Sequence, residues 1–444
     1  MTSVDPTLTL LRCGKLAGAT RLDLAYGLTE FPREIFDLAD TLEVLNLSQN
    51  QHDSLPDDLP RLRKLRILFA SENRFRHLPD VLGECSNLTM VGFKSNQIET
   101  VDAGAFPESL RWLILTDNRI RQLPGTLGRC TELQKLMLAG NQLSHLPDEM
   151  SACVNLELLR LAANNFTTLP DWLLELPRLS WLALGGNPLC VEQPSETDGV
   201  EEIQFSDLEM QDKLGEGASG IISKGLWKSK SRPVAVKIFK GAVTSDGLPS
   251  SEMAASLAAG SHENLVPLLG KISQHPSGAN GLVMALIPPE FRTLAGPPSL
   301  DSCTRDIYAE ETKFTLPVLL QMALGIASAA EHLHEQGVIH GDLYAHNVLW
   351  NDAGTALLGD FGAASFGHPE SILPRLQRFE VRAFGCLLEE LLIRCDAEIP
   401  EQLYSLRDRC LDPIPTRRPS FSEIYGELFH LQPQLGLYDS DSPS

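Results

Sequence analysis

Three polar side chains in the C-terminal half of the sequence are of the types that can act as a general base or as metal ligands. Asp342 and Asn347 lie in the segment HGDLYAHN, and Asp360 follows in LLGDFG. A carboxylate placed beside a hydroxyl can accept its proton during a reaction. Carboxylate and amide oxygens are hard ligands of the kind that Mg²⁺ prefers. By residue type, Asp342 could therefore serve as a base, and Asn347 and Asp360 could serve as ligands of a magnesium ion.

A glycine-rich segment, KLGEGASGIISKG, lies upstream and contains Gly215, Gly217 and Gly220. A G-x-G-x-x-G pattern brings the backbone close to phosphate groups, but it also occurs in dinucleotide-binding folds. Here it is followed by VAVKIFK, a β-branched run that carries Lys237 17 residues after Gly220. A dinucleotide-binding unit would have a helix at this point. The second strand therefore favours a different nucleotide-binding fold.

In this order the motifs resemble the protein kinase family, over roughly residues 206–432. The resemblance implies an α+β bilobal fold, with ATP and Mg²⁺ as cofactors. It makes Asp342 and Lys237 catalytic residues and pairs Lys237 with Glu252. The other ATP-binding residues that it implies are Leu214, Gly215, Gly217, Gly220, Ile222 and Ala235, with Ile222 and Ala235 packed on adenine.

The sequence departs from that family on the side where a protein substrate binds. Gly341 replaces an Arg that reads activation-loop phosphate, so we expect no switching by that phosphorylation. Tyr344 replaces the Lys with which Ser/Thr kinases contact the transferred phosphate. Only 20 residues separate Asp360 from Glu380, and no A-P-E motif lies between them. We therefore expect a short or missing floor for a peptide, and Arg418 lacks the Glu partner usual in the family.

Three functions are compatible with these motifs. The first is an ATP-dependent kinase that phosphorylates protein hydroxyls, Ser/Thr in preference to Tyr. The second is a small-molecule kinase, because H-G-D-x-x-x-x-N also resembles aminoglycoside phosphotransferases; the glycine loop and the segments RAFGCLLEELL and RRPSF speak against it. The third is a nucleotide-binding scaffold with little turnover. Retention of Lys237, Asp342, Asn347 and Asp360 favours an enzyme over a scaffold.

The N-terminal half contains a repeat of L-x-x-L-x-L-x-x-N, which resembles the leucine-rich repeat family over roughly residues 19–190. Its alternate Leu residues point into a solenoid, and the Asn can satisfy backbone groups where the chain bends out of each strand. Cys85, Cys130 and Cys153 share one repeat phase and are predicted to be small buried hydrophobes. The repeated asparagines are Asn50, Asn73, Asn96, Asn118, Asn141, Asn164 and Asn187.

The outward strand positions of the repeats carry an apolar and aromatic stripe. Such a stripe on the concave face of a solenoid indicates a docking surface for a protein partner. Cover by neighbouring side chains or by the second domain explains the same stripe equally well. The predicted partner-binding residues are Phe69, Met90, Trp112, Met137 and Trp181.

The composition bounds the remaining possibilities. The 444 residues are enough for two or three domains, and a net charge of −21 disfavours nucleic acid or an anionic membrane as partner. We find no apolar run long enough for a membrane span and no basic leader. Nine cysteines without metal spacing favour reduced thiols and a cytoplasmic location. We predict an α/β leucine-rich-repeat solenoid (1–190), a linker (191–205), a protein-kinase-like domain (206–432) and a flexible tail (433–444).

Overall fold

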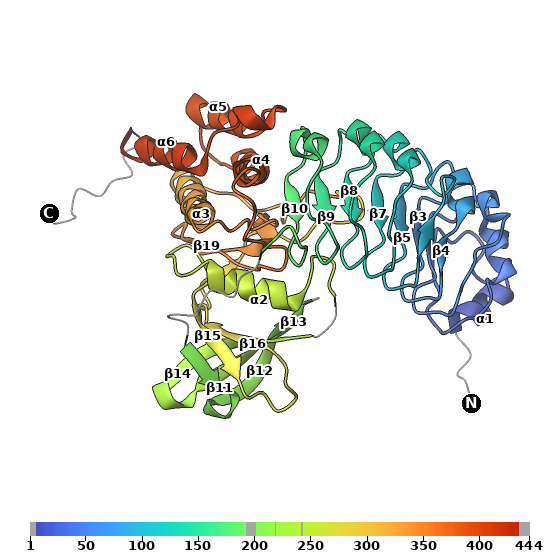
Figure 1. Cartoon of the computed structure of the whole chain (residues 1–444), viewed down its shortest axis with the longest axis horizontal. Coiled ribbons are helices and arrows are strands. Elements are labelled where there is room, and N and C mark those ends of the chain that lie inside the picture. The colour runs from blue at the N-terminus through green and yellow to red at the C-terminus, as the bar shows by residue number, and fades with distance from the viewer. Residues whose placement is uncertain (1–5, 192–200, 218, 241–242, 435–444) are drawn as a thin grey trace. The chain divides into compact units, whose positions relative to one another are not determined.

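The computed structural model describes residues 6–191, 201–217, 219–240 and 243–434. The chain divides into two compact units, residues 1–176 and 177–444 (Figure 1). Most of the predicted linker and nearly all of the predicted tail lie outside the described residues. The division falls between Leu176 and Pro177, so the last repeat, which periodicity assigns to the solenoid, belongs to the second compact unit.

The first unit is a solenoid of short parallel strands that follow a helix, α1 (Pro6–Arg12). The central residue of each strand points into the core, and Leu22, Leu45 and Leu68 pair in register with at most 2% of their surface exposed. In sheet order, the strands are β1 (Arg21–Asp23), β2 (Val44–Asn46), β3 (Ile67–Phe69), β5 (Met90–Gly92), β7 (Trp112–Ile114), β8 (Lys135–Met137) and β9 (Leu158–Arg160).

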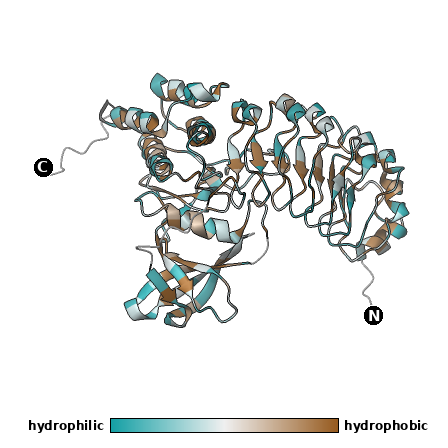
Figure 2. Ribbon diagram, viewed as in Figure 1, coloured by the Kyte–Doolittle hydropathy of each residue, from teal (hydrophilic) through white to brown (hydrophobic). Residues whose placement is uncertain are grey.

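Short 3₁₀ turns form the other side of most repeats, because the Leu-Pro pairs end the extended segments before them. Figure 2 shows mostly hydrophobic strands and turns of mixed polarity in this unit. A second, two-stranded sheet pairs β4 (His77–Leu78) with β6 (Thr100–Val101). The turns are η1 (Arg33–Leu38), η2 (Leu59–Arg61), η3 (Asp80–Glu84), η4 (Gly125–Arg129), η5 (Asp148–Ala152) and η6 (Asp171–Glu175).

The repeated asparagines have the predicted role. The Asn50 Nδ2 donates to the carbonyls of Leu24 and Leu47 at 2.6 and 2.8 Å, and its Oδ1 accepts from the Leu28 N–H at 2.8 Å. The same pattern recurs at the following asparagines, so each satisfies backbone groups that would otherwise be buried unpaired.

The phased cysteines are buried, as predicted. Burial raises the pKa of the Cys85 and Cys153 thiols to about 11 and that of Cys130 to about 12. These thiols therefore stay protonated and act as small apolar side chains.

The predicted docking stripe is only partly open in the first unit. Phe69 and Trp112 are half-buried, and the Lys135 ammonium lies 4.1 Å from the centre of the Trp112 ring. Met90 and Met137 are 4% and 8% exposed. A partner that docks on these residues would meet the two aromatic rings, whereas the two methionines contribute mainly to the core. Partner binding by this surface stays a prediction.

The second unit begins with the last repeat strand, β10 (Trp181–Ala183), and continues into a six-stranded sheet with one helix, α2 (Pro249–Ala258). Val234, Val236 and Val283 are fully buried in the core of this sheet. In spatial order the strands are β11 (Glu201–Gln204), β15 (Leu268–Ser273), β16 (Gly281–Ala285), β14 (Arg232–Phe239), β13 (Gly220–Trp227) and β12 (Leu208–Glu216).

The remainder of the second unit is mainly helical, so the expected bilobal α+β arrangement is present (Figure 1). A three-stranded sheet, β17 (Arg292–Thr293), β18 (Val348–Trp350) and β19 (Ala356–Leu358), packs beside α3 (Leu316–Glu335). Helix α3 also contacts α6 (Phe421–Gln434), and α4 (Leu373–Ile393) contacts α5 (Glu401–Cys410).

Helix α3 is the one helix among the described residues that is long and apolar enough to cross a membrane. Its Leu319, Leu320 and Ala323 side chains are fully buried inside the second unit. This burial is that of the core helix of a globular domain.

Candidate active site

The predicted pair of Lys237 and Glu252 is present. Strand β14 directs the Lys237 ammonium toward the Glu252 carboxylate on α2, and the two form an ion pair with 8% and 3% of their residues exposed. Burial raises the pKa of Glu252, and the Lys237 charge acts against that rise. Glu252 therefore keeps the Lys237 ammonium paired in a largely dry position.

The glycine-rich segment forms the hairpin of β12 and β13. Gly220 lies against β14, where a Cβ would be 2.6 Å from the Ile238 carbonyl oxygen. Only a residue without a side chain permits this close pairing next to Lys237. Gly215 and Gly217 have open space around them, as a loop that is to cover a ligand requires.

Asp342 and Asn347 are held together by two hydrogen bonds. The Asn347 Nδ2 donates to the Asp342 carbonyl at 2.9 Å and to its carboxylate Oδ2 at 2.8 Å. Both N–H groups of the Asn347 amide are directed at Asp342, so the orientation of the Asp342 carboxylate is set. The amide oxygen of Asn347 takes no part in these bonds and can serve as a metal ligand.

Asp360 is connected to the same segment through the backbone. The Gly359 N–H donates to the Asn347 carbonyl at 3.0 Å, and the His340 Nε2 bonds the Gly359 carbonyl at 3.0 Å. Asp360 itself has a φ of +55° and an exposed side chain whose Oδ1 accepts from the Gly362 N–H at 3.2 Å. A non-glycine residue in this strained conformation is a frequent feature of functional sites.

A cavity of about 410 Å³ lies beside these groups, within the size range of small-molecule sites. Apolar side chains form most of its wall. Four of the predicted site residues, Lys237, Glu252, Asn347 and Asp360, contribute polar side chains to it. A cavity with an apolar wall and a few charged side chains can accept a ligand that joins a flat base to a charged phosphate chain. The predicted residues that line it are Leu214, Ile222, Ala235, Lys237, Glu252, Asn347 and Asp360; Leu268, Met284 and Leu349 are additional ones.

Comparison with protein families agrees with this geometry. Residues 208–382 match the family described as protein tyrosine and serine/threonine kinase, and residues 86–143 and 131–189 match leucine rich repeats. The chain joins leucine-rich repeats to a protein kinase domain. Protein kinases in general use ATP and Mg²⁺, and the residues present in this kinase domain suit both ligands.

Curated relatives of the kinase domain include proteins named as tyrosine kinases and proteins named as serine/threonine kinases. The tyrosine-protein kinase transforming protein Abl of Abelson murine leukemia virus is 29% identical over 50% of this chain and 34% of its own length. A probable serine/threonine-protein kinase of Dictyostelium discoideum is 27% identical over 53% of this chain and 29% of its own. A probable cyclin-dependent kinase 10 of the same organism is 33% identical over 42% of this chain and 48% of its own length. The chain spans less than half the length of these relatives.

His346 is a site residue that the sequence analysis missed. It lines the cavity, and Asp306 accepts hydrogen bonds from its backbone N–H at 2.9 Å and its Nδ1 at 2.7 Å. Burial lowers the pKa of His346, but Asp306, Asp342 and Asp360 more than offset this, and the net pKa is raised. The position of His346 between Asp342 and Asn347 was a usable signal, whereas nothing in the sequence links Asp306 to it.

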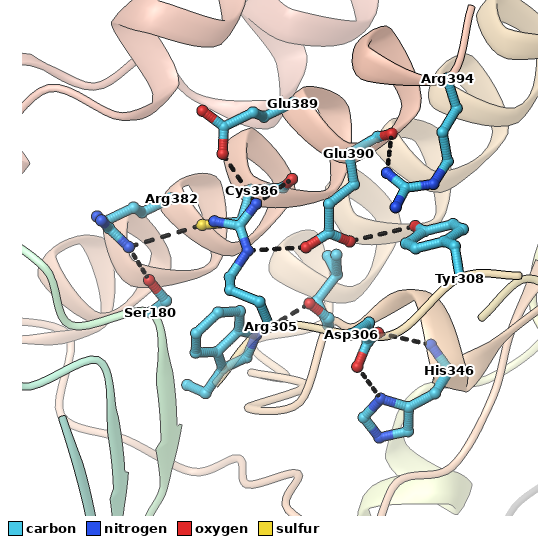
Figure 3. Close-up of polar contacts among 12 residues, drawn as sticks. Ser180, Arg305, Asp306, Tyr308, His346, Arg382, Cys386, Glu389, Glu390 and Arg394 are labelled. Carbon is cyan, nitrogen blue, oxygen red and sulfur yellow. Dashed lines mark hydrogen bonds and ion pairs between the residues drawn. The ribbon is translucent and has the colours of Figure 1, made fainter. Parts of the chain in front are cut away.

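A partly buried polar network in the kinase domain fixes Asp306 (Figure 3). The Arg305 Nε donates to Glu390 at 2.8 Å, and its Nη2 donates to Glu389 at 2.9 Å. The Tyr308 hydroxyl donates to the second Glu390 oxygen at 3.1 Å. Residues on both sides of Asp306 are thereby tied to α4, so the Asp306 carboxylate that holds His346 has a rigid support.

The unusual residues of the catalytic loop are packed inside the kinase domain. Tyr344 is 4% exposed and does not line the cavity, so the position of the missing Lys supplies no charge to a phosphate group there. Its ring stacks on Trp181, which is 1% exposed. Trp181 is therefore not available to a separate partner, contrary to its prediction as a docking residue, because the kinase domain already covers it.

Arg418 and Glu380 have partners that the sequence did not indicate. In place of a carboxylate, Arg418 contacts the carbonyls of Asp412, Arg378 and Pro177 at 2.9, 3.0 and 2.7 Å. Glu380 accepts from the Gly341 N–H and from the His334 ring, both at 2.7 Å. Burial raises the pKa of Glu380, but the bonds from His334 and Gly341 outweigh it and lower the net pKa.

Proposed function

We propose that the protein is an ATP- and Mg²⁺-dependent protein kinase that transfers the γ-phosphate to protein hydroxyls, Ser/Thr in preference to Tyr. The observation that carries this proposal is the cavity itself. The Lys237–Glu252 ion pair and the two proposed metal ligands, Asn347 and Asp360, line the same largely apolar cavity. A scaffold that only binds nucleotide has no need of both.

Each polar residue of the pocket has a distinct task in this proposal. The Lys237 ammonium binds phosphate oxygens, and Glu252 keeps that ammonium extended into the cavity. Asn347 and Asp360 would hold Mg²⁺, which neutralises charge on the phosphates when bound. The Asp342 carboxylate, oriented by the Asn347 amide, accepts the proton of the attacking hydroxyl.

The leucine-rich repeats are proposed to recruit the protein substrate or a regulator. Phe69 and Trp112 are the partly exposed aromatic residues of the predicted docking stripe. Binding at a remote surface raises the local concentration of an acceptor, which can replace contacts that a short segment after Asp360 does not supply. We propose a cytoplasmic location for this reaction, in keeping with the reduced cysteines.

The full chain incubated with radiolabelled ATP and Mg²⁺ tests the function. We expect label on the chain itself or on proteins of a lysate, with mass spectrometry locating it on Ser or Thr. Asp342→Ala should abolish transfer and leave nucleotide binding nearly intact. Asp408→Ala, at an exposed carboxylate on α5, is the matched control and should retain activity.

The results distinguish the proposed function from its two rivals. Transfer that persists in Asp342→Ala would show that Asp342 is not the base. Nucleotide binding without any transfer by the wild-type chain would instead identify a scaffold. Label found only on small hydroxylated molecules would identify a small-molecule kinase.

A further inference from the structure

The last repeat is in direct contact with the catalytic loop. The ring centres of Trp181 on β10 and Tyr344 are 4.1 Å apart, and the ring planes differ by 9°. The Trp181 Nε1–H also donates to the Leu343 carbonyl at 3.0 Å. The indole thus contacts the two residues that directly follow the proposed base, Asp342, and it is almost completely buried in doing so.

Two arginines anchor the backbone and side chains of the same repeat. The Arg382 Nη1 on α4 donates to the Ser180 hydroxyl at 2.6 Å, as Figure 3 shows. The Arg418 Nη2 donates to the Pro177 carbonyl at 2.7 Å. Charge-assisted bonds of this kind are among the strongest in proteins, and both arginines are buried. The segment that leads into Trp181 is therefore fixed at two points.

Backbone approaches complete the contact. At Gly341, with a φ of +73°, a Cβ would lie 2.7 Å from the Leu182 carbonyl oxygen. The Val191 N–H donates to the Gly367 carbonyl at 3.1 Å, in the segment after Asp360. The absence of an Arg at position 341 thereby has a steric reason, because a side chain there would collide with the repeat.

We propose that residues 177–191, the last repeat, form a working part of the kinase domain, with Trp181 and Tyr344 as positioning residues for Asp342. The repeat supports the catalytic loop where the segment between Asp360 and Glu380 is short, and Arg418 binds its carbonyl in place of a carboxylate. A displacement of about 1 Å at a reacting group can lower a rate about 100-fold, so this support acts on turnover. The inference rests on the proposed kinase function.

Steady-state kinetics of full-chain variants test this role. Trp181→Ala removes the stack and the bond to Leu343, and we expect kcat to fall about 100-fold while KM and Kd for ATP change less than about threefold. Trp181→Phe retains a ring and should recover most of the lost kcat. Trp172→Ala removes a half-buried tryptophan of the preceding repeat, whose Nε1–H donates to Asp148 at 3.2 Å, and should not alter kcat.

A double-mutant cycle tests whether the two rings act on kcat together, so that the conclusion does not depend on a single variant that folds poorly. Tyr344→Ala removes the other ring, and the Trp181→Ala/Tyr344→Ala double variant should be no slower than the worse single variant. Losses in kcat that multiply would overturn the proposal, as would an unchanged kcat in Trp181→Ala. An inactive wild-type chain would refute the kinase function itself, whereas an active wild type with an unaffected Trp181→Ala would refute only the role of the repeat.

Discussion

Gly341 and Leu182 approach each other so closely that a Cβ on Gly341 would lie 2.7 Å from the Leu182 carbonyl oxygen. The same glycine has a φ of +73° and donates its N–H to the fully buried Glu380. Three constraints therefore act on one backbone position. The residue that departs from the usual kinase pattern at this point is required by packing, independently of any effect on phosphate recognition.

Gly341→Ala should destabilise the chain by both backbone strain and collision. A left-handed conformation costs an ordinary residue about 1 kcal/mol, and overpacking adds about 1–3 kcal/mol. Gly278→Ala is the matched control, because Gly278 has a φ of +72° and nothing within 4 Å of a Cβ. Urea unfolding should show a loss at Gly341 at least twice that at Gly278. Equal losses would mean that Leu182 exerts no steric constraint.

Glu252→Gln should weaken phosphate transfer by removing the charge that orients Lys237. Because breaking a buried ion pair leaves an uncompensated charge, we expect unfolding to be easier by about 3 kcal/mol as well. Kinetics with varied ATP and chemical unfolding measure the two effects. Lys313→Met, at an exposed lysine, supplies the control for loss of a charge. Full activity in Glu252→Gln would remove Glu252 from the site.

Asp360→Asn should change the dependence on magnesium. The substitution keeps the shape of the side chain but removes the negative charge that a hard cation prefers. We expect the Mg²⁺ concentration for half-maximal ATP binding to rise about tenfold or more, whereas binding of ATP without metal should change little. Titration of a fluorescent ATP analogue at several Mg²⁺ concentrations measures this. An unaltered Mg²⁺ dependence would show that Asp360 is not a ligand.

Acid should destabilise the kinase domain through His368. Burial lowers the pKa of His368 to about 4, so the folded state binds fewer protons than the unfolded state between that value and the usual 6.5. Stability therefore rises with pH across this interval, by up to about 3 kcal/mol, and is lost on acidification. Urea unfolding at several pH values should show this slope in the wild type. The slope should be weaker in His368→Gln and unchanged in His145→Gln, at an exposed histidine.

Phe69→Ala/Trp112→Ala should raise KM for a protein acceptor without raising KM for ATP. Aromatic residues commonly dominate binding at protein interfaces, where truncation of one costs more than about 1 kcal/mol, or about fivefold in affinity. Val154→Ala, at an exposed position away from the strands, is the control. A KM for the protein acceptor equal to that of the wild type would exclude this surface from substrate recruitment.

The sequence alone determined the two architectures and seven of the residues that line the cavity, among them Lys237, Glu252, Asn347 and Asp360. A period shared by Leu and Asn can be read directly, because each repeat makes the same local hydrogen bonds, as Asn50 and its successors do. The kinase motifs can also be recognised directly in the sequence, because Lys237, Asp342, Asn347 and Asp360 occur in a fixed order on short segments.

Only the tertiary structure decided where the last repeat belongs and what surrounds the catalytic loop. Trp181 and Leu343 are 162 positions apart, and Asp306 and His346 are 40 apart, so no local pattern connects them. Periodicity assigns Trp181 to the solenoid stripe because its repeat position matches that of Trp112. In the folded kinase domain, however, Trp181 packs on Tyr344, and burial of the indole against that ring stabilises the contact.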